Sequence, residues 1–436
     1  MLKIFDLSLK LSGFPIEEGK KHFEEILAIP ESDYEAFIDK KKTEIVNFHL
    51  QNNSFYRELN GSDTFNNWND LPVLNKKNLQ KPLSERLSKG YTEKNVFLNK
   101  TSGSSGEPFI FAKDKYAHSV TWASIIYRFG WFGVDFNTSY QARFYGIPKD
   151  FIGYRKERLK DFLSKRYRFS IFDLSDEVLE GFLKHFKSKK FDYINGYTSS
   201  IVLFAKFLKK KSIVLKDICP TLKVCMVTSE MLFEEDKLLL ETQFGIPIVN
   251  EYGASELDLI AFQNPKGEWQ VNAETLFVEI LDENNRPVPI GQEGRIVITS
   301  LFNKAHPFIR YDIGDIGVLD EKSTLKKPIL KQLIGRTNDI AVLPSGKKSP
   351  GLTFYYVTKS IIEDDGNVKE FIIKQTKIDS FEIEYVSENE LSEPQIKKIE
   401  EAISLYLEPN LKFEFFRKAS LERTNRGKLK QFKSIL

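Results

Sequence analysis

The chain has 436 residues and a formal net charge of +3, with 41% hydrophobic and 29% charged residues. This composition is typical of a globular protein and excludes an intrinsically disordered chain. A net charge so close to zero gives no reason to expect nucleic acid as a partner, because nucleic-acid-binding domains are usually strongly basic. The length is sufficient for a large core and two or three domains.

Several features favour a cytoplasmic protein. The two cysteines, Cys219 and Cys225, match no zinc or redox spacing, and so few cysteines fit a reducing compartment. Lys3, Asp6 and Lys10 interrupt the apolar start of the chain, which is not the pattern of a signal peptide. No apolar run reaches the length of about 18 residues that a membrane span needs, so we expect no stable membrane insertion. The sequence leaves the oligomeric state open, with a homodimer as one option.

In chain order, residues 1–90 are predicted to be mostly helical. Ser32 and Glu35 have the spacing of a capping box and predict a helix from Ser32 to about Leu50. Residues 71–77 predict an extended segment followed by a new helix. Residues 114–132 have helical periodicity and many aromatic side chains, which belong to a core more often than to a ligand pocket.

Short apolar runs then alternate with helical patterns up to about residue 250, as in an α/β sheet domain. Buried strands are predicted at 222–227 and 246–250. A helix is predicted between them, starting near Phe233 and stopping at Gly245. The second of these strands leads into a predicted loop at 252–256.

From residue 269 to 319 the pattern changes to β structure, with hairpin-like strands at 278–281 and 295–298. A domain boundary is predicted near Gly335. The residues beyond it have their own pattern of strands and an amphipathic helix, at 369–375, 381–386 and 393–407. A segment from residue 335 to 436 with this mixture of strands and a helix is typical of a small α+β domain.

The most unusual stretch is Thr-Ser-Gly-Ser-Ser-Gly-Glu-Pro at 101–108. Its glycines let backbone N–H groups turn toward an anion, and its hydroxyls add donors that can rotate toward phosphate oxygens. It is not a Walker A loop, because Glu107 follows Gly106 where that motif has lysine. Strands rather than a helix are predicted beside it, at 95–98 and 109–111. The loop is a candidate phosphate clamp, with a plain Ser/Gly-rich surface turn as the alternative.

Four further motifs follow in order: Tyr-Gly-Ala-Ser-Glu at 252–256, Arg-Tyr-Asp-Ile-Gly-Asp at 310–315, Gly-Arg-Thr-Asn-Asp at 335–339 and Arg-Thr-Asn-Arg-Gly-Lys at 423–428. Each is weak alone. With the loop at 101–108, and in this order, they resemble the acyl-adenylate-forming superfamily of ligases. The closer likeness is to the phenylacetate–coenzyme A ligase family and its capsule-polysaccharide relatives, which the segments at 71–74 and 195–200 also resemble. The resemblance covers residues 70 to 433.

The resemblance implies an α/β fold with a large N-terminal domain of stacked sheets and helices at 1–334, including the helical lead at 1–90. A small mobile C-terminal α+β domain would occupy 335–436. The implied activity is that of an ATP- and Mg²⁺-dependent enzyme that converts a small carboxylic acid to an acyl-adenylate, releases pyrophosphate and transfers the acyl group to an acceptor.

We expect coenzyme A as the acceptor. The alternative is acyl or aminoacyl transfer to an amine or hydroxyl of a sugar in capsule or surface polysaccharide biosynthesis. A degenerate adenylate-binding protein is a rival interpretation, which the intact carboxylates and lysine of the motifs disfavour. A plain ATPase or kinase is another, and the missing Walker lysine disfavours it.

The nucleotide-binding residues are carried over from the same resemblance. The phosphates of ATP would be held by Thr101, Ser102, Gly103, Ser104, Ser105 and Gly106. Tyr252 would stack on adenine, in the segment that continues with Gly253, Ala254 and Ser255. Asp315 would accept hydrogen bonds from the ribose hydroxyls, since one carboxylate can accept from two hydroxyls. Arg336 would add a contact to the ribose or to the phosphates.

Glu256 and Lys428 are the expected catalytic residues. Glu256 is the candidate ligand of Mg²⁺, which typically takes one or two carboxylates together with phosphate oxygens. Lys428 would bridge the substrate carboxylate and the α-phosphate, a task that suits a compact ammonium group. The expected acyl pocket is formed by Tyr197, Thr228, Ser229 and Glu230.

The small domain would rotate about Asn338 between the two half-reactions. Two positions depart from the family pattern. Many members have lysine or threonine where this chain has Glu107, and the hinge position, commonly Asp or Lys, is Asn338 here. Neither departure looks disabling.

Overall fold

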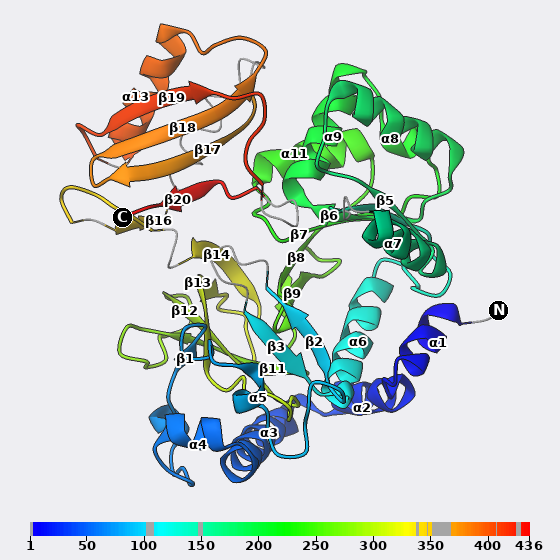
Figure 1. Cartoon of the computed structure of the whole chain (residues 1–436), viewed down its shortest axis with the longest axis vertical. Coiled ribbons are helices and arrows are strands. Elements are labelled where there is room, and N and C mark those ends of the chain that lie inside the picture. The colour runs from blue at the N-terminus through cyan, green and yellow to red at the C-terminus, as the bar shows by residue number, and fades with distance from the viewer. Residues whose placement is uncertain are drawn as a thin grey trace. The chain divides into compact units, whose positions relative to one another are not determined.

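The computed structural model describes residues 3–101, 109–146, 151–336, 340–346, 348–350, 368–406, 408–423 and 429–436 (Figure 1). The chain divides into two compact units. The first consists of Met1–Ile313 and Val318–Lys331, and the second of Gly314–Gly317 and Gln332–Leu436. The second unit therefore includes a short stretch of strand β13 (Tyr311–Leu319).

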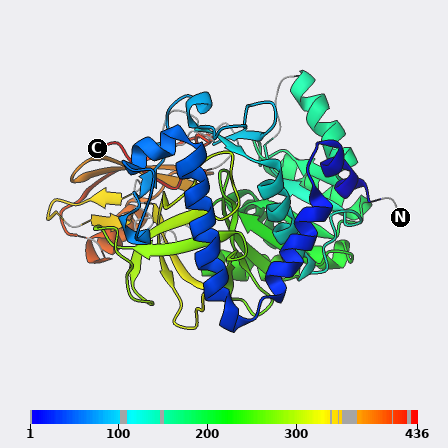
Figure 2. The ribbon, with the colours of Figure 1, turned by 90° about the horizontal axis from the view of Figure 1, so that it is seen from below.

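The predicted helical lead is confirmed. Its helices are α1 (Ile4–Leu11), α2 (Ile16–Ala28), α3 (Glu31–Asn52), α4 (Ser54–Asn60) and the short α5 (Leu83–Arg86). Figure 2 shows α2 and α3 as two long helices that meet end to end. The apolar sides of α2 and α3 pack with α6 (Lys115–Gly130) in one core. This core includes Phe23 of α2, Ile38 of α3 and Val120 of α6.

Two predictions in this region are wrong. Helix α3 begins at Glu31, directly after Pro30, and has no side-chain cap. Ser32 therefore lies in the first turn, where its hydroxyl donates to Asp33 at 2.9 Å instead of capping the helix. The helix predicted after residues 71–77 starts only at Leu83, as the short α5, because a turn comes first, in which the side chain of Asn75 accepts from the backbone N–H groups of Lys77 and Asn78.

A seven-stranded sheet has the strand order β10-β9-β8-β7-β6-β4-β5. Its strands are β4 (Gln141–Phe144), β5 (Arg166–Phe169), β6 (Tyr193–Tyr197), β7 (Val224–Thr228), β8 (Ile248–Ala254), β9 (Asp258–Gln263) and β10 (Trp269–Val271). Strands β4 to β8 run parallel, and β9 and β10 extend the sheet antiparallel. The predicted α/β domain and its buried strand at 222–227 are confirmed.

Alternate residues of this sheet face two different helical layers, because successive side chains of a strand point to opposite faces. Cys225 and Val227 pack with the helices α8 (Asp176–Ser188), α9 (Thr198–Lys210), α10 (Leu215–Ile218) and α11 (Glu234–Phe244). Val224 and Met226 pack with Phe129 of α6 on the other face. Helix α11 ends as predicted at Gly245, whose φ of 67° is left-handed.

A second sheet has the order β1-β13-β12-β11, with β14 (Leu330–Arg336) also paired to β13. Strands β11 (Leu276–Leu281) and β12 (Glu293–Ser300) form the predicted antiparallel hairpin. Strand β1 (Leu74–Asn75) pairs parallel to β13. A separate hairpin is formed by β2 (Phe97–Lys100) and β3 (Ile110–Lys113), as predicted around the Ser/Gly-rich loop.

The second unit has its own sheet with the order β19-β18-β17-β20. The predicted strands and helix correspond to β17 (Val368–Lys377), β18 (Ser380–Ser387) and α13 (Glu393–Tyr406), and the chain adds β15 (Ile340–Val342), β16 (Lys348–Pro350), β19 (Lys412–Arg417) and β20 (Phe432–Ser434). Ile399 and Ile403 of α13 are buried, one helical turn apart.

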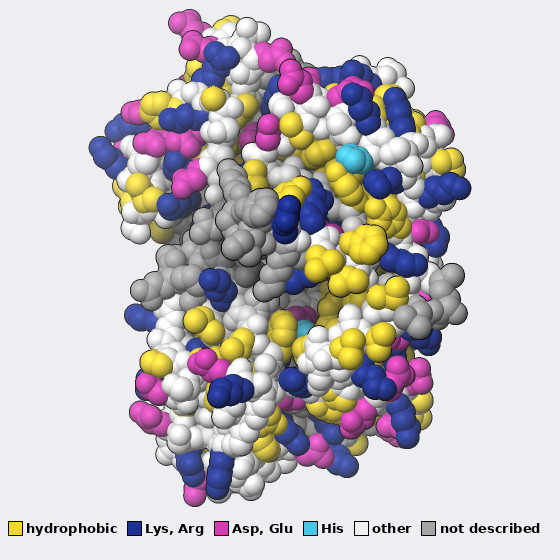
Figure 3. Space-filling model, turned by 45° about the vertical axis from the view of Figure 1, so that its right-hand side comes forward, with side chains coloured by type: hydrophobic (Ala, Val, Ile, Leu, Met, Phe, Trp, Pro, Cys, Tyr) yellow, Lys and Arg dark blue, Asp and Glu magenta, His cyan; other side chains and the backbone are white. Residues whose placement is uncertain are grey.

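None of the helices in the described ranges combines the length and the apolar character needed to cross a bilayer. On the face that Figure 3 shows, Lys and Arg side chains are interspersed with Asp and Glu side chains. This mixture agrees with the net charge of +3. Among the described residues, the face in view therefore has no extended surface of one sign.

Candidate functional site

The Ser/Gly-rich loop is closed at its base by two hydrogen bonds. The backbone N–H of Thr101 donates to the carbonyl of Phe109 at 2.9 Å, and the N–H of Phe109 donates to Oγ1 of Thr101 at 3.1 Å. The remaining predicted phosphate-binding residues, together with Glu107, lie outside the described residues: Ser102, Gly103, Ser104, Ser105 and Gly106. Their role in holding phosphate stays a prediction.

Three of the predicted site segments meet at one edge of the seven-stranded sheet. Tyr197 at the end of β6 pairs in register with Thr228 at the end of β7, and Thr228 pairs with Glu251 of β8. Since these strands are parallel, the chain segments that follow them leave the sheet at the same edge. The carboxyl edge of a parallel sheet is where open α/β folds bind their ligands.

The predicted pocket residues at this edge are already held by local contacts. The carboxylate of Glu230 accepts from the backbone N–H of Ser199 in the first turn of α9 at 2.7 Å, where the helix dipole favours a negative charge. Ser229 has a left-handed φ of 71°. Tyr197 is buried and its ring lies 4.5 Å from that of Tyr145. Their contact with an acyl group stays a prediction.

The loop predicted at 252–256 is mostly strand. Tyr252, Gly253 and Ala254 still belong to β8 and pair with β9, so the turn contains only Ser255, Glu256 and Leu257. A bulge between Tyr252 and Gly253 brings the two strands so close that a Cβ at Gly253 would lie 2.5 Å from the carbonyl oxygen of Asp258. Glycine is therefore required for this turn.

Tyr252 is buried, and its ring meets that of Trp269 of β10 edge-on at 5.9 Å. Stacking of adenine on Tyr252 stays a prediction, and so does contact of the nucleotide with Gly253, Ala254 and Ser255.

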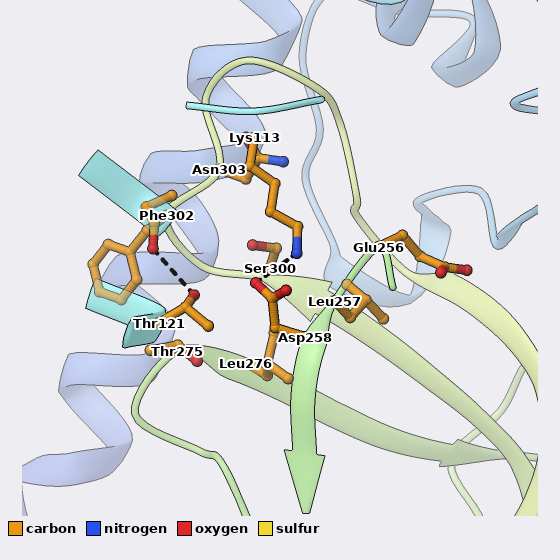
Figure 4. A pocket seen from close by; sticks show the side chains of 11 residues that line it. Lys113, Thr121, Glu256, Leu257, Asp258, Thr275, Leu276, Ser300, Phe302 and Asn303 are labelled. Atoms are coloured by element: carbon orange, nitrogen blue, oxygen red, sulfur yellow. Dashed lines mark hydrogen bonds and ion pairs between the residues drawn. The ribbon is translucent and has the colours of Figure 1, made fainter. Parts of the chain in front are cut away.

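Glu256 is 8% exposed, and its Oε1 accepts from the hydroxyl of Tyr311 at 3.0 Å. Figure 4 shows its carboxylate pointing away from the neighbouring pair of Lys113 and Asp258. Among the described residues, no three His, Cys, Asp or Glu side chains are grouped to hold a metal ion. One oriented carboxylate fits Mg²⁺ bound mainly through phosphate oxygens and water, so Glu256 remains the candidate ligand.

A buried ion pair that the sequence analysis missed links the β2–β3 hairpin to this turn. Lys113, the last residue of β3, lies 2.5 Å from the carboxylate of Asp258 and donates to the carbonyl oxygen of Ser255 at 3.3 Å (Figure 4). His118 approaches the same carboxylate at 3.6 Å. Burial opposes ionisation of Asp258, but Lys113 and His118 outweigh it and hold its pKa well below the usual range.

The cavity beside this ion pair has a volume of about 20 Å³, which admits about one water molecule and no nucleotide. The only sequence signal for Lys113 and Asp258 was their closeness to two motifs, since Asp258 follows Glu256 by two residues.

Arg310, the first residue of the motif at 310–315, has a structural role. It is fully buried, pairs with Glu279 at 3.3 Å and donates to the carbonyl oxygen of Leu71 at 2.9 Å. Its own carbonyl accepts from the N–H of Leu74 at 2.9 Å. Arg310 therefore joins the motif at 310–315 to the segment at 71–74.

The remaining predicted residues belong to the second unit. Asp315 is buried on β13, within the stretch Gly314–Gly317. Arg336 ends β14, and its side chain lies outside the described part of the structure. Asn338 and Lys428 also lie outside the described residues. The ribose, hinge and lysine assignments therefore stay predictions.

The fold is that of the acyl-adenylate-forming ligases. The chain aligns with a solved structure of 2-hydroxyisobutyryl-CoA ligase in complex with 2-HIB-AMP at a TM-score of 0.71 and 15% identity, over 93% of this chain and 90% of that chain. It aligns with the amide bond synthetase McbA from Marinactinospora thermotolerans at a TM-score of 0.55 and 14% identity, over 77% and 68%.

In sequence, the chain is 25% identical to Protein CapK from Staphylococcus aureus over 434 residues, 94% of this chain and 91% of that protein. It is 24% identical to phenylacetate-coenzyme A ligase from Aromatoleum evansii over 230 residues, 48% of this chain and 51% of that protein. No family model matches the chain. The resemblance that the motifs predict is thus confirmed by the relatives and by the fold.

Proposed function

We propose that this protein activates a carboxylic acid with ATP to form an acyl-adenylate and then transfers the acyl group to an acceptor. The observation that carries the proposal is the placement of Glu256. Its buried carboxylate is oriented by Tyr311 in the turn after β8, and Lys113 ties that turn to the hairpin that bears the Ser/Gly-rich loop. A phosphate-binding loop and a metal-binding carboxylate must lie close together for this chemistry.

Adenylation brings two anions together, the substrate carboxylate and the α-phosphate of ATP. Bound Mg²⁺ would supply positive charge at the phosphates. Glu256 would hold that ion, and the loop at 101–106 would orient the departing pyrophosphate. Lys428 would offset the remaining repulsion between carboxylate and phosphate. Tyr252, Asp315 and Arg336 would bind the adenosine part, as the similarity to adenylate-forming ligases implies.

The acceptor that we favour is coenzyme A, as in the names of phenylacetate-coenzyme A ligase and 2-hydroxyisobutyryl-CoA ligase. Transfer to an amine is the second candidate, because the fold is shared with an amide bond synthetase and because CapK, whose name gives no CoA ligase activity, is a sequence relative over most of both chains. The small number of cysteines supports a cytoplasmic location.

Pyrophosphate exchange with a panel of carboxylic acids tests the proposal. We expect radiolabelled pyrophosphate to enter ATP only when both an acid and Mg²⁺ are present. Acid-independent ATP hydrolysis without exchange for any acid would contradict adenylation. Once an acid is found, adding coenzyme A or an amine separately, and identifying the product by mass, decides between the two acceptors.

A further inference from the structure

Arg143 of β4 lies on the sheet face that ends in the expected acyl pocket. It pairs in register with Asn195 of β6, two residues before Tyr197. Side chains two residues apart on a strand share a face, and so do register partners on neighbouring parallel strands. Arg143 therefore faces the same side as Asn195 and, one strand further, Met226 and Thr228, whereas the ring of Tyr197 at the end of β6 packs with the core of the α8 to α11 layer.

Charges on this part of the face are unequally paired. Two arginines of the neighbouring strand β5 are paired with carboxylates. Arg168 contacts Glu157 at 2.8 Å and Asp161 at 3.0 Å. Arg166 also contacts Asp161, at 2.5 Å. Within the described ranges, Arg143 has no carboxylate within 4.0 Å. Among the described residues, Arg143 is thus an arginine of this face without an ionic partner.

The surroundings of Arg143 do not replace a partner. Its side chain is half-buried, its Nε atom is buried without a hydrogen-bond acceptor, and its guanidinium lies 4.1 Å over the ring of Tyr145. An aromatic face attracts a cation but accepts few of the five N–H donors of a guanidinium. Keeping such a group half-buried is unfavourable unless an anion binds to it.

Glu251 is the next acidic group on this face, and it is engaged elsewhere. Its Oε1 accepts from the hydroxyl of Thr228 at 3.0 Å. Burial raises the pKa of Glu251. The hydrogen bond from Thr228 and the charge of Arg143 both lower this pKa, but burial outweighs them. Glu251 therefore balances Arg143 only from a distance.

We propose that Arg143 binds a second anionic group of the acid substrate, so that the substrate is a carboxylic acid with a further carboxylate or phosphate at its far end. This inference rests on the proposed function and names its substrate class. Strand β4 is three strands from β8, which at about 4.8 Å per strand is a sideways separation of roughly 14 Å, and the strand register places Arg143 level with Val249 of β8, several residues before the turn of Glu256. The rings of Tyr145 and Tyr197, 4.5 Å apart, would line the middle of such a molecule.

Matched pairs of acids test this substrate class. Pyrophosphate exchange is measured for α,ω-dicarboxylic acids of increasing length, for the monocarboxylic acids of the same length and for ω-phosphorylated acids. We expect the wild type to prefer the dianionic member of a pair by about 10-fold or more in kcat/KM, as one charged hydrogen bond allows. Whether dicarboxylic or ω-phosphorylated acids are preferred identifies the second anionic group of the substrate as a carboxylate or a phosphate.

Arg143→Met should lower kcat/KM for the dianionic acid by about 10- to 100-fold and leave that for the matched monoacid unchanged. Arg143→Lys keeps the charge and should lose less, and Arg57→Met, which removes an exposed arginine of α4, should change neither. Equal use of both members of every pair by the wild type would overturn the inference, whether or not Arg143→Met folds. Exchange with no acid at all would instead overturn the proposed function.

Discussion

Tyr311 is a buried residue of β13 whose hydroxyl is 3.0 Å from the carboxylate of Glu256. A carboxylate that binds a metal needs a fixed orientation, which a neighbouring hydrogen bond provides. In the proposed site Glu256 would bind the metal ion, and Tyr311 would hold the carboxylate of Glu256 in a fixed orientation.

Glu256→Gln should reduce pyrophosphate exchange by about 100-fold or more, since it removes the charge that holds Mg²⁺. Tyr311→Phe removes one hydrogen bond and should mainly raise the Mg²⁺ concentration that gives half-maximal exchange, by about 10-fold. Titration of exchange activity with Mg²⁺ measures both effects. If Tyr311→Phe leaves the Mg²⁺ dependence unchanged, Tyr311 is only a core residue.

Lys428→Ala should slow adenylation by about 100-fold or more, because a charge that stabilises the transition state contributes about 3–4 kcal/mol. Transfer from chemically prepared acyl-adenylate should be affected much less. Lys433→Ala is the matched control, since Lys433 is an exposed lysine of β20 in the same tail. Equal loss of both half-reactions in folded Lys428→Ala would make Lys428 a structural residue.

At the scale of elements, the β2–β3 hairpin and the β8–β9 turn are held together by Lys113 and Asp258, which are 2.5 Å apart. Their side chains are 6% and 20% exposed, so each would be left poorly solvated without the other. Breaking a buried pair by removing one partner is strongly destabilising.

Lys113→Met should therefore lower the free energy of unfolding by about 3–5 kcal/mol, because Asp258 stays charged and loses its partner. Lys113→Met combined with Asp258→Asn should cost less than the two single changes together. Urea unfolding of the four proteins gives the interaction energy from a double-mutant cycle. Strictly additive losses would mean that the two side chains do not stabilise each other.

Two buried histidines link α3 and α5 to the segment that follows β12. Nε2 of His49 is 2.9 Å from the carbonyl oxygen of Asn303, and Nε2 of His306 accepts from the guanidinium of Arg86 at 2.6 Å. Burial lowers the pKa of His49 to about 4 and outweighs the hydrogen bond to Asn303, which would raise this pKa. Burial, with the charge of Arg86, holds the pKa of His306 well below its usual range.

The free energy of unfolding should therefore decrease as the pH falls from about 6.5 to about 4, by about 3 kcal/mol for His49 alone. In this window the unfolded chain binds protons that the folded protein excludes, and above it the full stability is present. His49→Gln, which can keep the hydrogen bonds to the carbonyl of Asn303 and to the hydroxyl of Ser88, should reduce the pH dependence. Urea unfolding at a series of pH values checks this, and an unchanged slope would contradict it.

At the scale of the whole molecule, the chain consists of two compact units, and the predicted hinge lies just after β14. If Lys428 reaches the α-phosphate as proposed, one active site could catalyse both half-reactions only if that lysine withdraws before the acceptor arrives. Proline fixes φ near −65° and also restricts the residue before it, so a proline at the hinge limits such a rotation.

Asn338→Pro should therefore preserve one half-reaction and slow the other by at least about 10-fold. Single-turnover measurements of adenylation and of transfer distinguish the two steps. Wild-type rates for both would show that this protein needs no rotation about Asn338.

The sequence by itself determined the main elements and the order of the motifs. Periodicity and turn residues that lie within a few positions of one another predict three of these elements correctly. They are the buried strand β7, the end of α11 at Gly245 and the β11–β12 hairpin. The same local rules failed at Ser32 and after Asn75, where Pro30 moved the start of the helix and an Asn side chain stabilised a turn. In both places two local signals competed.

Only the tertiary structure decided which side chains meet. Lys113 bonds to a carbonyl 142 residues away, and nothing in the sequence around either residue predicts that contact. Arg143 has no place in any motif, and its position opposite Asn195 depends on the register of three separate strands. Contacts of this kind arise from strand order and from the burial of charge, which depend on the whole fold rather than on neighbouring residues.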